Sequence, residues 1–279
     1  MIIQRSNNIY EELPKFKVIH GCGINSFRTT ANKPIPDYVV PHVSSDIKVV
    51  TISNYRHQNP FIELYLNSNT MDFHFIELQT FRCWIDKIEP LITLAKSITN
   101  KYILYFDASD ALIVSDINNP KDILDKYGCK VLFNAEDGYS QPGHPCDPKI
   151  WLADCPDYYN TKHIIIDKNK LNLSKKMITN GFTRSLNAGV FLGEREFLID
   201  ALQQILDLML DNPKKSYPYG ESCDQVLWQH IMANCQNNEI EIDFYNLFFL
   251  WTHSRKFDFP VTHWEHFNYF NNINSLAGK

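Results

Sequence analysis

Apolar runs and amphipathic stretches alternate along most of the chain. Residues 47–53 and 102–106 are nearly continuous apolar runs, a pattern typical of strands that are buried on both faces. Residues 84–95 and 196–210 instead repeat their apolar side chains at helical spacing. The same reasoning predicts further strands at residues 73–78, 130–134, 188–192 and 240–244, and further helices at 60–66, 122–127 and 224–235. This alternation predicts an α/β fold with a mostly parallel mixed sheet covered by helices on both faces.

The first 45 residues lack this rhythm. Prolines interrupt them at positions 14, 34, 36 and 41, and only residues 16–20 have the pattern of a short strand. We therefore expect one domain over residues 1–279, with an irregular N-terminal extension over 1–45 and the core over 46–279. Residues 137–162 form a long loop rich in Gly and Pro, and a loop of this length is expected to act as a lid over a ligand.

The balance of charge excludes some classes of partner. The chain has 27 Lys and Arg against 32 Asp and Glu, so it has no excess of basic residues for binding nucleic acid. No apolar stretch is long enough to predict a membrane-spanning segment. The N-terminus has no apolar core of a signal peptide, so a soluble protein of the cytoplasm, or of a host-cell cytoplasm, is expected.

Two carboxylates follow the most apolar predicted strand. Asp107 directly follows residues 102–106, and Asp110 precedes another apolar stretch at 111–114. Ligands of parallel α/β sheets bind at the carboxyl ends of the strands. Carboxylate oxygens suit Mg²⁺ or Mn²⁺, which would offset the charge of a nucleotide diphosphate. The alternative is that both residues only cap a turn, which Asp does well.

Five short motifs occur in an order that resembles the glycosyltransferase domain of the procollagen lysyl hydroxylase/glucosyltransferase family. They are Asp107-Ala-Ser-Asp110, Phe133-Asn-Ala-Glu136, Leu186-Asn-Ala-Gly-Val-Phe-Leu-Gly193, Asp224-Gln225 and Pro260-Val-Thr-His263. Together with the strand from Ile47, the resemblance covers most of the chain outside the first 45 residues. The chain departs from the family pattern at His144-Pro145, where the family has Trp-Pro, and at Cys223, where it has Asp.

The resemblance implies a GT-A-type Rossmann-like domain and a metal-dependent glycosyltransferase. It implies that Asp107, Asp110 and His263 hold the metal, with His266 as the alternative to His263. Imidazole among carboxylates favours Mn²⁺ as the cofactor, with Mg²⁺ as the alternative.

The other candidate residues concern the donor and the reaction. The candidate nucleotide-binding residues lie at the end of the first strand, before the strand at 102–106, between Asp107 and Asp110, and in the Leu186–Gly193 motif. They are Thr51, Ile52, Ser53, Lys87, Asp107, Ser109 and Gly189. The candidate catalytic residues carry carboxyl or amide groups and are Glu136, Asn187, Asp224 and Gln225. Each has a structural alternative: Lys87 could be a solvated helix residue, and Asp224 could be a helix N-cap.

The expected reaction is transfer from a UDP-sugar. By resemblance, UDP-glucose is the donor, galactosyl-hydroxylysine of a collagen-like protein is the acceptor, and the transfer retains the anomeric configuration. An alternative enzyme would use UDP-galactose and act on another glycan or a lipid. An alternative of another class is a non-catalytic domain that binds carbohydrate or a protein. The presence of Asp107, Asp110 and His263 argues against it, because a domain that only binds has little need of a metal site.

Overall fold

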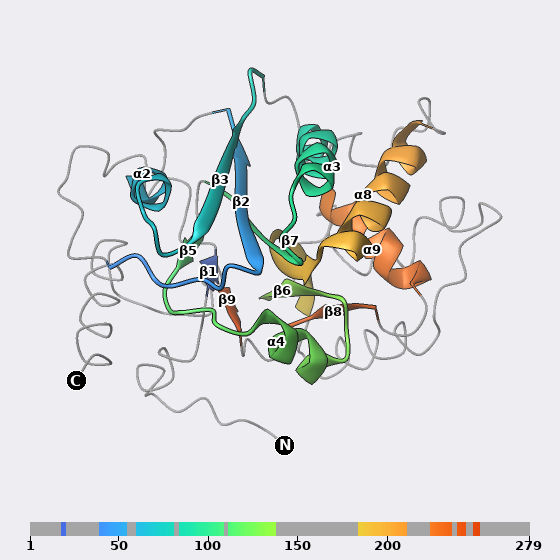
Figure 1. Cartoon of the computed structure of the whole chain (residues 1–279). Helices are drawn as coiled ribbons and strands as arrows, with labels where there is room; N and C mark the ends of the chain where they lie inside the picture. The colour runs from blue at the N-terminus through green and yellow to red at the C-terminus, as the bar shows by residue number, and fades with distance from the viewer. Residues whose placement is uncertain are drawn as a thin grey trace.

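A six-stranded sheet forms the centre of the molecule (Figure 1). The computed structural model describes residues 18–20, 39–54, 60–80, 84–108, 111–137, 184–210, 224–235, 239–243 and 248–251. The strands of the sheet lie in the order β3 (Asp72–Glu77), β2 (Ile47–Ser53), β4 (Tyr102–Phe106), β7 (Arg184–Glu194), β6 (Val131–Asp137) and β8 (Ile240–Ile242). β7 runs antiparallel to both of its neighbours, and the other strands run parallel to one another. The carboxyl ends of these parallel strands therefore share one edge.

Helices cover both faces of this sheet. On one face lie α3 (Ile88–Ser97), α8 (Arg195–Leu210) and α9 (Asp224–Asn234), and the 3-10 turn η4 (Trp84–Lys87) leads into α3 (Figure 1). The other face packs against α2 (Pro60–Leu66) and α4 (Pro120–Tyr127). The predicted fold class, an α/β domain with a mostly parallel mixed sheet between helices, is confirmed.

The central strand β4 shows how the sequence assigns side chains to the two faces. All of its residues are buried. Leu104 and Phe106 pack on the α2 and α4 side, whereas Ile103 and Tyr105 pack on the α3, α8 and α9 side. Because side chains of a strand alternate between faces, Asp107 continues on the same side as Tyr105. The strand therefore directs this carboxylate towards α3 and α9.

A small three-stranded sheet lies beside the main one, in the order β5 (Ala111–Ile113), β1 (Val18–His20) and β9 (Phe249–Trp251). β1 is antiparallel to β5 and parallel to β9. Val18 is fully buried, and Val43 is buried and forms a bridge with Ile117. The hydrophobic core thus includes residues of the first 45, which the sequence predicts to be an irregular extension.

Local signals fix the ends of several elements. The Asn119 side chain accepts a hydrogen bond from the Asp122 N–H, and Pro120 occupies the first turn of α4. Gly128 ends this helix with a φ of 63°, a left-handed conformation that glycine adopts at no steric cost. Among the helices that the structure describes, none has the length and apolar character needed to cross a membrane.

Candidate functional site

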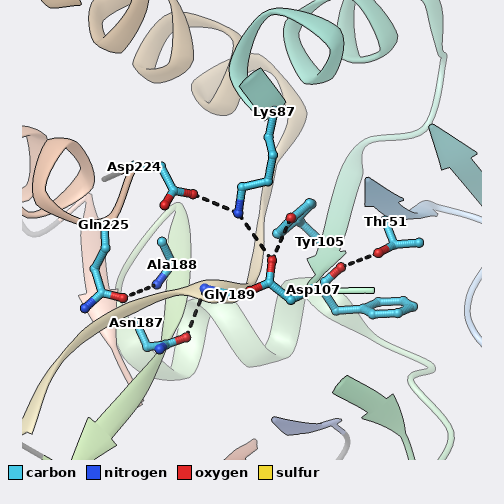
Figure 2. Close-up of polar contacts among 10 residues, drawn as sticks. Thr51, Lys87, Tyr105, Asp107, Asn187, Ala188, Gly189, Asp224 and Gln225 are labelled. Carbon is cyan, nitrogen blue, oxygen red and sulfur yellow. Dashed lines mark hydrogen bonds and ion pairs between the residues drawn. The ribbon is translucent and has the colours of Figure 1, made fainter. Parts of the chain in front are cut away.

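Asp107 directly follows β4 at the carboxyl edge of the sheet, where three groups hold it. Its backbone N–H donates to the Gly189 carbonyl on β7 at 2.7 Å. The Tyr105 hydroxyl donates to Asp107 Oδ1 at 2.9 Å, and Lys87 Nζ donates to the same oxygen at 3.2 Å (Figure 2). The Asp107 side chain keeps 18% of its surface exposed. It is therefore fixed by the protein and still open to a ligand.

Lys87 joins this carboxylate to a second one. Its Nζ lies 2.9 Å from Asp224 Oδ2 and 3.2 Å from Asp107 Oδ1 (Figure 2). The side chains of Lys87 and Asp224 are only 5% and 9% exposed. Three separate parts of the chain, namely η4, the residue that follows β4 and the start of α9, thus meet at one ammonium group. We refer to Lys87, Asp107 and Asp224 as the charged cluster.

Burial and charge perturb the ionisation of this cluster in opposite directions. Burial disfavours the Lys87 ammonium, but Asp107 and Asp224 outweigh it and raise the pKa of Lys87 well above its ordinary value of 10.5. Burial raises the pKa of Asp224 above 3.8, although Lys87 acts to lower it. Burial also raises the pKa of Tyr105 well above 10.0, so its hydroxyl stays protonated and can donate. The cluster therefore holds one ammonium between two carboxyl groups.

Lys87 is a buried cation at the N-terminus of a helix, a position that does not by itself stabilise the fold. Lys87 is the N-cap of α3, and its side chain caps no backbone group there. A positive charge is unfavourable at a helix N-terminus, because the helix dipole is positive at that end. Burying charged groups also costs free energy that their mutual attraction only partly offsets. Buried charges with perturbed pKa values at a ligand-binding edge mark a candidate functional site.

β7 has a bulge beside the charged cluster. The register pairs Phe133 with Phe191 and then Asn134 with Asn187, so residues 188–190 of β7 have no partner on β6. Side chains hold the bulged backbone: Asn187 Oδ1 accepts from the Gly189 N–H at 2.9 Å, and a second amide, Gln225 Oε1, accepts from the Ala188 N–H at 3.3 Å. Bulges often re-aim the chain next to active sites. Here Gly189, one of the bulged residues, accepts the hydrogen bond from the Asp107 N–H.

The structure gathers six of the sequence-predicted residues in one place. They are Lys87, Asp107, Asn187, Gly189, Asp224 and Gln225 (Figure 2). Glu136 lies on β6 opposite Ser185, at the same edge of the sheet. Ser109, Asp110, His263 and His266 lie outside the described residues, so their roles stay predictions. The same holds for the predicted lid at 137–162 except for Asp137, which is the last residue of β6.

The three candidates at the end of β2 divide differently. Thr51 is fully buried, and its hydroxyl donates to the Phe106 carbonyl at 2.6 Å. Ile52 is buried in the core beneath α3, and Ser53 is half-buried at the end of the strand. Thr51 therefore fixes the backbone that leads into Asp107. This hydrogen bond supports the position of Asp107 and is not itself a contact with a ligand.

Sequence reasoning missed Tyr105. Its ring occupies an ordinary apolar position of a buried strand, a position that the sequence pattern assigns to the core. The signal that could have found it is the alternation of β4, which puts a hydroxyl two positions before a carboxylate on the same face.

A divalent cation fits part of this site. Within the described residues, no group of three or more His, Cys, Asp or Glu side chains is placed to hold a metal. Asp107 suits Mn²⁺ or Mg²⁺ as one hard oxygen ligand, because it is partly exposed and belongs to a cluster with two carboxylates and one ammonium. Asp110 and His263, the other predicted ligands, lie outside the described residues.

Comparisons with known proteins give little more. No family model and no curated protein sequence matches the chain. Among solved structures, core-mannan synthase A from Aspergillus fumigatus, in a form with Mn and GDP, matches 76% of this chain and 77% of its own length. The identity is 8% and the TM-score is 0.34, so the similarity is loose.

Proposed function

We propose that this chain is a metal-dependent glycosyltransferase that uses a nucleotide sugar. The observation that carries the proposal is the charged cluster, which lies at the carboxyl edge of the sheet beside the β7 bulge. Nucleotides bind at this edge in α/β folds. The cluster combines a partly exposed carboxylate with a buried, perturbed Lys–Asp pair, a combination that a purely structural sheet edge does not need.

Asp107 could not bind a diphosphate directly, because both groups are negatively charged. A divalent cation between them would remove this repulsion, and when bound it would act as a Lewis acid on the departing diphosphate. Lys87 would hold Asp107 and Asp224 at a fixed separation during this step. Gly189 has no side chain, so the bulged backbone could approach a bound sugar closely.

The finer assignment rests on the sequence resemblance. The proposed donor is a UDP-sugar, specifically UDP-glucose, and the proposed acceptor is galactosyl-hydroxylysine of a collagen-like protein, with retention of configuration. UDP-galactose with another glycan or a lipid as acceptor is the competing assignment. Asp224 and Glu136, from α9 and β6, are the carboxyl groups that we propose for contact with the donor sugar or the acceptor.

The first test measures nucleotide binding by calorimetry. UDP and GDP are titrated into the full chain with Mn²⁺ and then with a chelator. We expect UDP to bind only with Mn²⁺ and Asp107→Asn to weaken this binding by at least about tenfold, since a neutral amide replaces an anionic ligand. Asp46→Asn is the matched control, because Asp46 precedes β2 at the opposite edge of the sheet and is half-exposed.

Equal UDP affinity with Mn²⁺ and with chelator would refute the metal-dependent mechanism. Tighter binding of GDP than of UDP would support a glycosyltransferase that uses a GDP-sugar and would contradict the proposed UDP-sugar donor.

The second test is turnover. Donor hydrolysis with Mn²⁺ is screened across UDP-glucose, UDP-galactose and GDP-mannose, first alone and then with a galactosyl-hydroxylysine peptide or lactose. NMR of the product gives the anomeric configuration of the new bond. A chain that binds Mn²⁺ and UDP and yet turns over none of these donors would support the non-catalytic binding domain instead.

A further inference from the structure

Tyr105 contacts two members of the charged cluster at once. It lies on β4 two positions before Asp107 and is 1% exposed. Its hydroxyl donates to Asp107 Oδ1 at 2.9 Å, and Lys87 Nζ lies 5.1 Å from the centre of its ring, within range of a cation–π interaction. Tyr105 therefore contacts the Asp107 carboxylate through its hydroxyl and the Lys87 ammonium through the face of its ring.

Aromatic packing fixes the Tyr105 ring itself. The ring stacks on Phe191 of β7, with 5.0 Å between ring centres and 22° between planes. Phe191 in turn contacts Phe133 of β6 at 5.1 Å and Trp228 of α9 at 5.7 Å. Trp228 follows Asp224 by one helical turn, so the same packing anchors the start of α9. The aromatic side chains thus form a rigid base under the charged cluster.

We propose that Tyr105 is a positioning residue for the cation bound by Asp107, an inference that rests on the proposed function. The Tyr105 hydroxyl and the Lys87 ammonium donate to the same oxygen, Oδ1, and so fix the plane of the carboxylate. A metal ligand that hydrogen bonds already orient loses less freedom when it binds the ion. Without the hydroxyl, Lys87 still donates to Oδ1, but its long side chain has more rotatable bonds than a tyrosine and holds the carboxylate plane less firmly.

The test is Mn²⁺ affinity of the full chain, measured from the EPR signal of free Mn²⁺, without and with UDP. Tyr105→Phe removes the hydroxyl and keeps the ring and its stacking. Tyr102→Phe is the matched control, because it makes the same change on the same strand, and Tyr102 packs on the opposite face of the sheet. We expect Tyr105→Phe to weaken Mn²⁺ binding by about tenfold, because it loses one charge-assisted hydrogen bond to Asp107. Tyr102→Phe keeps this bond, so its Mn²⁺ affinity should stay within about twofold of the unaltered chain.

The melting temperature of the metal-free variants separates positioning from a merely structural role. If the hydroxyl only contributes a structural hydrogen bond to Asp107, Tyr105→Phe lowers this temperature and leaves the Mn²⁺ affinity unchanged, which overturns the inference. If the unaltered chain binds no Mn²⁺ with or without UDP, the proposed function fails and the inference falls with it. Mn²⁺ binding by the unaltered chain and equal binding by Tyr105→Phe would overturn the positioning role alone.

Discussion

Replacement of Lys87 by Met should destabilise the fold strongly, because Met keeps much of the volume and loses the ammonium. With an effective dielectric constant of ~20, contacts of 2.9 and 3.2 Å to Asp224 and Asp107 correspond to about 5–6 kcal/mol each before desolvation. Removing the ammonium also removes its own desolvation cost of several kcal/mol. The net loss for one partner of a buried ion pair is then ~3–5 kcal/mol in the free energy of unfolding.

The destabilisation of Lys87→Met should depend on pH. Burial raises the pKa of Asp224, and the ammonium that lowers it is absent from the variant, so the folded pKa rises further above the unfolded value. The folded variant therefore binds this proton more tightly than the unfolded chain, and its stability increases as the pH falls through the folded pKa. In the wild type the pKa of Lys87 is raised, so the stability that the ammonium contributes is complete below 10.5 and is lost only as the pH rises through the higher folded pKa.

Urea unfolding of both chains between about pH 5 and pH 8 measures this effect. The difference in free energy of unfolding between wild type and variant should be largest at the upper end and shrink towards the lower end. The double variant Lys87→Met/Asp224→Asn is the control, since it removes the buried charge of Asp224 and should recover part of the loss. A loss for Lys87→Met below about 1 kcal/mol at every pH would refute the buried bridge, because exposed ion pairs contribute no more than that.

Two further predictions concern packing and a buried carboxylate away from the cluster. Gly193→Ala should cost about 1–3 kcal/mol in urea unfolding, because a Cβ there would lie 2.7 Å from Val131 and 3.1 Å from Leu198; an unchanged midpoint would contradict the close packing. Asp243→Ala should cost about 3–5 kcal/mol, since the fully buried Asp243 accepts from the Tyr127 hydroxyl and from two backbone N–H groups at the start of β9. Tyr127→Phe removes one of these three bonds and should cost less than half as much by the same measurement; equal losses would show that the N–H bonds contribute nothing.

Much of the main sheet and its helices could be predicted from the sequence. The apolar run at 102–106 gives β4 with its observed bounds, and the helices predicted from 196 and 224 agree with α8 and α9 to within one residue. These elements have strong periodicity and bury long apolar faces. The direction of β7 could not be predicted, because an apolar strand between two sheet neighbours shows the same pattern in either orientation.

The candidate site was predicted in part for a similar reason. Asp107 and Asp224 follow from motifs, but the pattern around Lys87 also fits a solvated residue on an exposed helix face. Its burial depends on α9, which lies far away in the sequence, and local periodicity carries no information about such a contact. The structural role of Thr51 likewise depends on a carbonyl of a neighbouring strand, Phe106.

The small sheet has a consequence for biosynthesis. β1 lies between β5 and β9, and Val18 pairs with Phe249. β1 is therefore synthesised long before its partner β9. While the ribosome synthesises the intervening residues, one edge of β1 stays unpaired, and such an edge can pair with other chains. β5 begins at Ala111, shortly after Asp107, so the small sheet that holds this strand is complete only when residues 249–251 have emerged. Nascent chains stopped before that point should therefore lack ligand affinity even where the main sheet has formed.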